Sequence, residues 1–169
     1  MAKVLIVYDS RTGNTEKMAK AVEQGASKAG ADVRLKKVAE AELSDLEWAD
    51  GIILGSPNYF GAMSAKMKEF IEESIGLYGE GKLKNKVGAV FTSASGAGTG
   101  SEVTALSLLT AMFAHEMIIV GAAGREPGRS GTYGVIADNL ATVGSPDEKM
   151  LDNCKRLGTQ VADVAQKLA

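Results

Sequence analysis

The feature that most limits the fold of this chain is a short apolar run near its start, followed at once by a polar loop and an amphipathic helix. Residues 3–8 (KVLIVY) are apolar without alternation, which is typical of a strand covered on both faces in a parallel sheet. Apolar or small residues then recur at helical spacing from Thr15 to Ala29, and Gly30 follows them as a helix C-terminal residue would. The beginning of the chain therefore predicts a strand, a loop and a helix.

The same unit recurs along the rest of the chain. We expect further strands over residues 32–37, 51–56, 87–93 and 117–120, and helices over residues 44–47, 64–75, 102–115 and 145–168. Residues 32–37 alternate in polarity, as a strand near an edge does, and Pro57 is expected to break the strand before it. Ser145 is the expected N-cap of the last helix. Five strands alternating with helices predict an open, doubly wound α/β fold with a parallel sheet and helices on both faces.

Length, charge and cysteine content narrow the class of protein. The 169 residues suffice for one core, so we expect a single domain over residues 1–169. The longest apolar runs are too short to span a bilayer and no signal-peptide pattern precedes the first strand, which predicts a cytoplasmic protein without membrane insertion. The formal charge of −2 is spread over both signs and argues against nucleic acid as a partner. The single Cys154 excludes an internal disulfide and a cysteine-based metal site, and we predict no metal.

Three loops must meet where ligands bind in such folds, beyond the carboxyl ends of the strands: residues 9–15, 57–62 and 93–100. The first loop carries hydroxyl and amide side chains directly before a helix, whose N–H groups and dipole favour an anion. It lacks the lysine of a Walker loop and the three-glycine dinucleotide pattern, so it suits the terminal phosphate of a small cofactor. A plain capped turn is the alternative. The candidate phosphate-binding residues are Ser10, Arg11, Thr12, Gly13, Asn14 and Thr15.

The other two loops suit a flat heteroaromatic ring. Tyr59 and Phe60 are adjacent although the chain has only four residues of each type, and the alternative is that they cover the core edge. Residues 92–100 (TSASGAGTG) offer backbone donors, with glycines one residue short of the dinucleotide spacing. The candidate ring-binding residues are Pro57, Asn58, Tyr59, Phe60, Gly61, Ser93, Ala94, Ser95, Gly96, Ala97 and Gly98. His115 is included as a residue beside the ring, with a solvated helix C-terminus as its alternative role.

These motifs resemble those of flavodoxin-like FMN proteins. Residues 10–15 (SRTGNT) resemble the flavodoxin phosphate loop. Residues 56–61, 63–64, 67, 91–93, 98–102, 117–120 and 132–134 follow in order those of the tryptophan-repressor-binding-protein type of NAD(P)H:quinone oxidoreductase, so the resemblance covers nearly the whole chain. It implies a five-stranded parallel sheet of order 2-1-3-4-5. It also implies that residues 10–15 hold the FMN phosphate, that residues 57–61 and 93–98 flank the isoalloxazine, and that His115 matches a family histidine near the flavin.

The resemblance implies an FMN-dependent oxidoreductase that carries two electrons from NAD(P)H to a quinone or another small acceptor. We assign no catalytic side chain, because the cofactor carries the chemistry. The chain lacks an insertion that these reductases have between the second and third strands, and its segment 122–132 is shortened. Since those segments help to build the reductases' tetramer and nicotinamide access, a homo-oligomer and the use of NAD(P)H as co-substrate are left open.

Two other functions use the same fold. A flavodoxin-type one-electron carrier would serve a redox protein partner, but a near-balanced charge gives little of the acidic field that steers carriers. A response-regulator-like binding module would need an acidic pair after the first strand and an aspartate after the third. Here Asp9 stands alone and Ser56-Pro57 takes the third-strand position. Oxidation of NAD(P)H by a free quinone separates the enzyme from the carrier.

Overall fold

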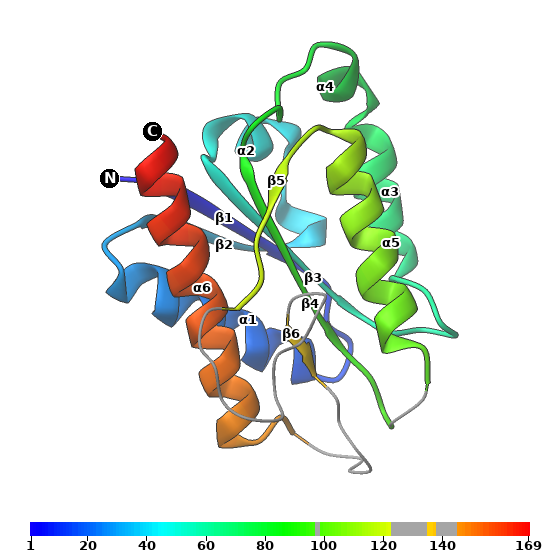
Figure 1. Ribbon diagram of the computed structural model, residues 1–169. Helices are drawn as coiled ribbons and strands as arrows, with labels where there is room; N and C mark the ends of the chain where they lie inside the picture. The colour runs from blue at the N-terminus through cyan, green and yellow to red at the C-terminus, as the bar shows by residue number, and fades with distance from the viewer. Residues whose placement is uncertain (97–98, 123–134, 138–144) are drawn as a thin grey trace.

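A parallel sheet covered by helices on both faces forms the centre of the molecule (Figure 1). The computed structural model describes residues 1–96, 99–122, 135–137 and 145–169. Its strands are β1 (Lys3–Tyr8), β2 (Asp32–Lys37), β3 (Gly51–Pro57), β4 (Val87–Ser93), β5 (Ile118–Ile119) and β6 (Val135–Ala137). Its helices are α1 (Asn14–Lys28), the 3-10 turn η1 (Val38–Glu40), α2 (Leu43–Trp48), α3 (Ala65–Glu73), α4 (Ile75–Gly79), α5 (Ser101–Ala114) and α6 (Glu148–Leu168). The strand order β2-β1-β3-β4-β5 confirms the predicted fold class.

The apolar run of β1 serves two hydrophobic cores because its side chains alternate between the faces of the sheet. Val4 and Ile6 pack in the core beneath α1 and α6, whereas Leu5 and Val7 pack in the core beneath α2, α3 and α5. All four side chains are fully buried. A strand sandwiched in this way needs apolar residues at every position, which explains the missing alternation.

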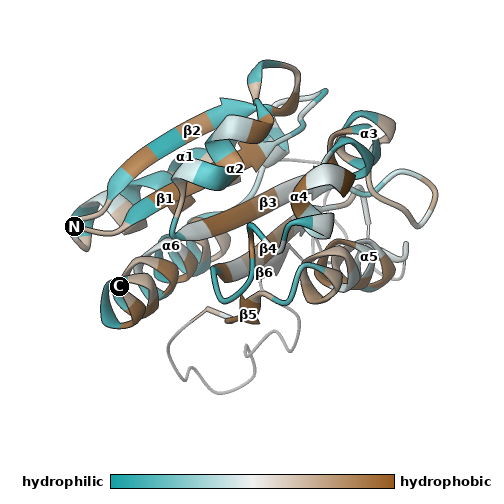
Figure 2. Cartoon of the chain, turned by 90° about the horizontal axis from the view of Figure 1, so that it is seen from above, coloured by the Kyte–Doolittle hydropathy of each residue, from teal (hydrophilic) through white to brown (hydrophobic). Residues whose placement is uncertain are grey.

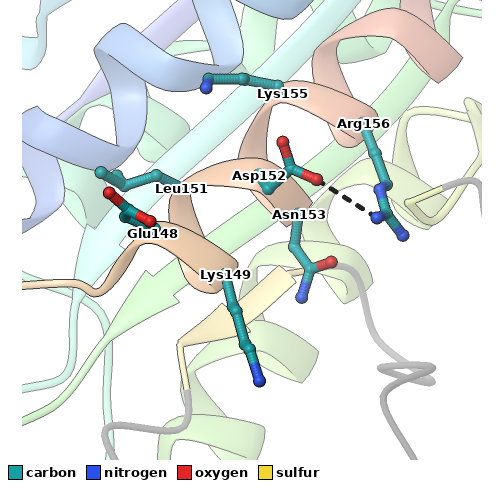
Figure 3. Close-up of a pocket in the computed structure, with 7 residues that line it drawn as sticks. All are labelled: Glu148, Lys149, Leu151, Asp152, Asn153, Lys155 and Arg156. Carbon is teal, nitrogen blue, oxygen red and sulfur yellow. Dashed lines mark hydrogen bonds and ion pairs between the residues drawn. The ribbon is translucent and has the colours of Figure 1, made fainter. Parts of the chain in front are cut away.

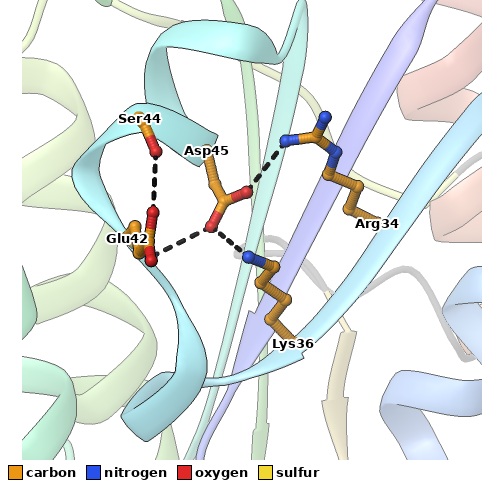
Figure 4. Close-up of polar contacts among 5 residues, drawn as sticks. All are labelled: Arg34, Lys36, Glu42, Ser44 and Asp45. Carbon is orange, nitrogen blue, oxygen red and sulfur yellow. Dashed lines mark hydrogen bonds and ion pairs between the residues drawn. The ribbon is translucent and has the colours of Figure 1, made fainter.

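The edge strand β2 has a different pattern, as predicted. Figure 2 shows β2 alternating between teal and brown, whereas β3 is largely brown. β2 pairs only with β1 within the described residues, and none of its six residues is buried. Its polar side chains hold the neighbouring helix, because the Asp45 carboxylate of α2 accepts from Arg34 at 3.0 Å and from Lys36 at 2.7 Å (Figure 4).

Two helix boundaries differ from those predicted. The helix expected over residues 64–75 is broken at Ser74, whose hydroxyl donates to the Ile71 carbonyl at 2.7 Å, so that α3 and α4 are separate. The N-cap of α6 is Asp147, which accepts from the Met150 amide at 2.8 Å, and not Ser145. Pro57 is the last residue of β3 rather than the residue after it.

The predicted strand over residues 117–120 is shorter, and a further strand continues its edge. β5 pairs with the first residues of β4, at Val87 and Gly88, while β6 pairs with the last three, from Phe91 to Ser93. Both run parallel to β4. The three apolar residues of β6, Val135–Ala137, are too short a run to predict a strand from the sequence. Within the described residues, no helix is both long and apolar enough to cross a membrane.

Candidate functional site

The three loops singled out in the sequence follow β1, β3 and β4, whose carboxyl ends lie side by side in the sheet. Hydrogen bonds join them. The hydroxyls of Thr15 and Ser93 lie 2.8 Å apart, and the backbone amide of Asn58 donates to the Ser93 carbonyl at 2.7 Å. The structure thus brings residues from all three loops to one edge of the sheet, which is the candidate site.

The first loop opens α1 with an uncapped end. Its N-cap residue is Gly13, in the left-handed region at φ +92°, which has no side chain to cap the helix. A Cβ built on Gly13 would meet no atom within 4 Å, so the space in front of this residue is open. Gly13 donates to the Ser10 hydroxyl at 3.1 Å, which fixes the turn. An open helix N-terminus of this kind favours an anion.

Nearby charge does not oppose an anion at this helix end. Glu16, in the first turn of α1, is paired with Lys20 at 2.8 Å and with Lys37 at 3.8 Å. The hydrogen bond and charge of Lys20 lower the pKa of Glu16, with a smaller contribution from Lys37. Arg11 and Thr12 are exposed at the loop tip. The loop therefore offers a cation and a hydroxyl to solvent, while the Glu16 carboxylate in the first turn of α1 is paired with lysines.

The Thr15 side chain is buried, and its hydroxyl shares a hydrogen bond with Ser93. This contact ties the first turn of α1 to the end of β4. The sequence groups Thr15 with the phosphate-binding residues, and that role stays a prediction.

The second loop is a strained turn that presents an aromatic ring. Tyr59 and Ala62 exchange two backbone hydrogen bonds, of 2.9 and 3.1 Å, across Phe60 at φ +55° and Gly61 at φ +81°. Two positive φ angles in a two-residue turn are those of type I′, which rarely places a phenylalanine at its first central position. The Phe60 side chain is fully exposed, at 110% relative accessibility. An exposed aromatic ring on a strained turn is a frequent mark of a binding site.

The third loop leaves the sheet through buried residues. Ser93 and Ala94 are buried, Ser95 is exposed and Gly96 is half-buried. Thr99 donates to the Gly96 carbonyl at 2.8 Å and closes the loop before α5. Ala97 and Gly98 lie outside the described residues.

The structure does not bring His115 to this site. As a crossover helix, α5 runs back along the sheet, so its C-terminal cap His115 lies near β5, which pairs with the first residues of β4. Its Nε2 is 2.9 Å from the Ser74 hydroxyl, and Tyr78 contacts it edge to face. Burial lowers the pKa of His115. Within the described part of this one chain, His115 therefore lies at the opposite end of the sheet from the three loops, as the return of a crossover helix dictates, and its predicted place beside the ring stays a prediction.

Other hollows lie away from the three loops. Figure 3 shows a groove along the first turns of α6, lined mainly by charged side chains, with Asp152 paired to Arg156. In the described part of the chain, no three His, Cys, Asp or Glu residues are grouped to hold a metal ion. Cys154 is fully buried on α6, and burial raises the pKa of its thiol to about 12.

Two residues of the site were missed in the sequence. Thr99 and Thr104 both bond to the Asn58 side chain, through the Thr99 carbonyl at 2.8 Å and the Thr104 hydroxyl at 3.1 Å. Thr99 lies in the third loop but was not among its candidate residues, and Thr104 lies outside the three loops, so only the folded structure reveals their contacts with Asn58.

Comparison with known proteins gives consistent matches over the whole chain. Residues 38–124 match the family of NADPH-dependent FMN reductases. The chain is 42% identical to an NAD(P)H dehydrogenase (quinone) of Archaeoglobus fulgidus, covering 99% of this chain and 100% of that protein. It is 40% identical to a flavodoxin of Aquifex aeolicus, over 96% of this chain and 86% of that protein. Among solved structures, a flavodoxin, WrbA-like protein of Agrobacterium tumefaciens superposes with a TM-score of 0.82 at 25% identity, covering 99% of each chain.

Proposed function

The chain belongs to the NAD(P)H dehydrogenase (quinone) family of flavodoxin-like proteins, and from this premise we propose that it is an FMN-dependent oxidoreductase that passes two electrons from NAD(P)H to a quinone. The observation that carries the proposal is the juxtaposition of an uncapped helix N-terminus with an exposed aromatic turn, joined through Ser93. The first suits a phosphate and the second suits a flat ring. FMN has both groups.

The first loop fits the phosphate of FMN in shape and charge. The space in front of Gly13 is open, the first turn of α1 has no side-chain cap, and Thr12 and Arg11 are exposed beside it. Each of these features supplies a donor or a positive partial charge to a phosphate dianion. We assign the phosphate to Ser10, Arg11, Thr12, Gly13, Asn14 and the Thr15 amide.

The other two loops fit the ring. Phe60 gives an aromatic face, Gly61 leaves open space beside it, and residues 93–96 supply a wall of small side chains. A ring held between them would exclude water from one face. We therefore assign the isoalloxazine to residues 57–61 and 93–98. The Asn58 side chain bonds within the protein, to Gly61, Thr99 and Thr104.

When bound, FMN supplies the redox chemistry, by which NAD(P)H, a proton and a quinone give NAD(P)⁺ and a hydroquinone. The chain's own residues bind and orient the cofactor. The helix N-terminus of α1 anchors one end, and the Phe60 turn and the loop after β4 hold the other at a spacing fixed by the Thr15–Ser93 contact. This scheme requires no acid or base side chain.

A flavodoxin-type electron carrier is the second candidate, and the 40% identity to a protein named flavodoxin favours it. A carrier would use the same cofactor site but a redox protein partner in place of the quinone. The formal charge of −2 gives only a weak field to steer such a partner. A homo-oligomer and a cytoplasmic location stay predictions.

The test is steady-state oxidation of NADPH and NADH by the FMN-loaded protein with a soluble benzoquinone as acceptor and no second protein. The proposal expects turnover that needs FMN and rises with quinone concentration. The carrier predicts no turnover until a separate flavodoxin reductase is added.

A further inference from the structure

The Asn58 side chain, at the carboxyl end of β3, uses all of its hydrogen-bonding capacity inside the protein. Its Oδ1 accepts from the Gly61 amide at 2.9 Å and from the Thr104 hydroxyl at 3.1 Å. Its Nδ2 donates to the Thr99 carbonyl at 2.8 Å and to the Thr99 hydroxyl at 3.2 Å. A carboxamide has two acceptor lone pairs and two donor hydrogens, so these four contacts leave none for a ligand.

Three of the four contacts reach parts of the chain that are distant in sequence from Asn58. Thr104 lies in the first turns of α5 and Thr99 closes the loop after β4, whereas Gly61 lies in the turn that carries Phe60. The Asn58 backbone amide adds a fifth hydrogen bond, to the Ser93 carbonyl. One amide thus bridges the two loops that we assign to the two sides of the flavin ring.

The Phe60 turn needs such a bridge because, in the part of the chain that the structure describes, the ring is fully exposed and buries no surface against a neighbour. Phe60 is fully exposed and sits at φ +55°, a backbone region that costs energy for a residue with a side chain. The hydrogen bond from Gly61 to Asn58 ties the tip of the turn to the Asn58 side chain, and the Gly61 backbone also lies next to Gly100 before α5. Loss of this hydrogen bond would free the tip to relax.

We propose that Asn58 is a positioning residue: it touches no ligand itself, but sets the gap between the Phe60 turn and the loop after β4 and thereby controls the affinity for the flavin ring. This inference rests on the proposed function, since it concerns the same cofactor site. It replaces the sequence-based prediction that Asn58 contacts the cofactor.

Two variants separate the halves of the bridge. Asn58→Ala removes all four side-chain contacts. Asn58→Asp keeps the acceptor for Gly61 and Thr104 but, when ionised, sets a carboxylate oxygen against the Thr99 carbonyl. When protonated, the aspartic acid again has an acceptor and a donor and imitates the native amide.

The experiment measures the dissociation constants of FMN and riboflavin by quenching of flavin fluorescence, for the wild type, both variants and the surface control Asn153→Ala. We expect Asn58→Ala to weaken both flavins by the same factor, about tenfold, because the ring is common to both. The Asn58→Asp variant should bind both flavins weakly at pH 7 and regain flavin affinity as the pH falls towards 5. The flavin affinities of the wild type and of Asn153→Ala should change little over that range.

The pH-dependent recovery ties flavin affinity to the protonation state of residue 58, and urea denaturation of Asn58→Asp at the same pH values shows whether the variant stays folded while affinity is lost, which a merely structural role would not produce. If Asn58→Ala does not fold, Asn58→Asp alone still decides the matter. Flavin affinity unchanged in Asn58→Ala, or equally weak at all pH values in Asn58→Asp, would overturn the positioning role while leaving the proposed function intact. A wild type that binds neither flavin would instead remove the proposed function on which the inference rests.

Discussion

The hydroxyl oxygens of Thr15 and Ser93 lie 2.8 Å apart, although 78 positions separate the two residues in the chain. Both side chains are buried. The contact joins the first turn of α1 to the last residue of β4, and so joins the loop that suits a phosphate to the loop that suits a ring. Because neither hydroxyl is free to move, the distance between these two parts of the site is built into the fold.

Replacement of Thr12 by alanine should weaken FMN much more than riboflavin. Thr12 is exposed at the loop before α1, and a hydrogen bond to a charged phosphate contributes about 1.5–3 kcal/mol, which is at least about tenfold in affinity. Riboflavin lacks the phosphate and serves as the matched ligand. Titration of both flavins into the apoprotein checks this, and equal losses for the two would show that the phosphate is misplaced.

Phe60→Gly should weaken flavin binding without destabilising the protein. The aromatic face is worth about 1–3 kcal/mol of stacking, so we expect roughly a tenfold loss of affinity for both FMN and riboflavin. Since Phe60 is fully exposed at a positive φ, glycine should leave the free energy of unfolding the same or raise it by up to about 1 kcal/mol.

The control for this variant is Phe113→Ala, which removes another exposed phenylalanine, on the outer side of α5. It should leave flavin affinity unchanged. Urea denaturation of the apoproteins gives the stabilities. If the Phe60→Gly protein binds flavin as tightly as the wild type does, the Phe60 ring does not contact the flavin and this part of the account is refuted.

His115 should make the protein less stable in mild acid. Ser74 donates its proton to the Ile71 carbonyl, so Nε2 of His115 must donate to Ser74, and the buried Nδ1 has no hydrogen-bond partner among the described residues. Burial lowers the pKa of His115 below the usual 6.5. Between these two values the unfolded chain takes up a proton that the folded protein excludes, so stability is complete above pH 6.5 and declines as the pH falls below it.

Urea denaturation between pH 8 and pH 5 tests this, with His115→Gln as the comparison because glutamine keeps a donor for Ser74 but does not titrate. We expect the variant to lose part of the decline seen in the wild type below pH 6.5. If the free energies of unfolding of the wild type and of His115→Gln change in parallel with pH over the whole range, His115 is not held as a buried, neutral imidazole.

Gly25→Ala should disrupt the packing of α1 on α6. A Cβ at Gly25 would lie 1.8 Å from the Lys155 carbonyl oxygen, a clash with backbone that no rotamer relieves. We expect the free energy of unfolding to fall by about 2 kcal/mol or more. The control is Gly76→Ala on α4, where the added methyl meets no atom within 4 Å. This change should leave the free energy of unfolding the same or raise it by up to about 1 kcal/mol. Thermal denaturation of the pair gives the difference, and similar midpoints would contradict the close helix contact.

The central strands were predictable because their residues are buried on both faces. The bounds of β1 and β4 agree with the apolar runs of the sequence, and those of β2 agree with the segment that alternates in polarity. The break at Ser74 was not predictable, since it depends on contacts with Ile71 and with His115 from a distant helix. β6 was missed because three residues beside a completed sheet leave no periodic pattern.

The site was predictable to the level of loops but not of side-chain roles. Strand ends and helix starts define which loops meet, because all strands of the sheet run in parallel. Whether a polar side chain in those loops faces a ligand or a neighbouring loop is decided by tertiary contacts. The side chains of Thr15 and Asn58, which the sequence places among ligand-binding residues, bond to neighbouring loops in the structure.

The most direct test of the account is the visible spectrum of the FMN-loaded protein, held without oxygen while NADPH and then NADH are added. We predict that the yellow absorption band bleaches rapidly without any second protein and returns when a quinone is added. A band that persists through both nucleotides and bleaches only with dithionite would contradict the oxidoreductase and favour an electron carrier.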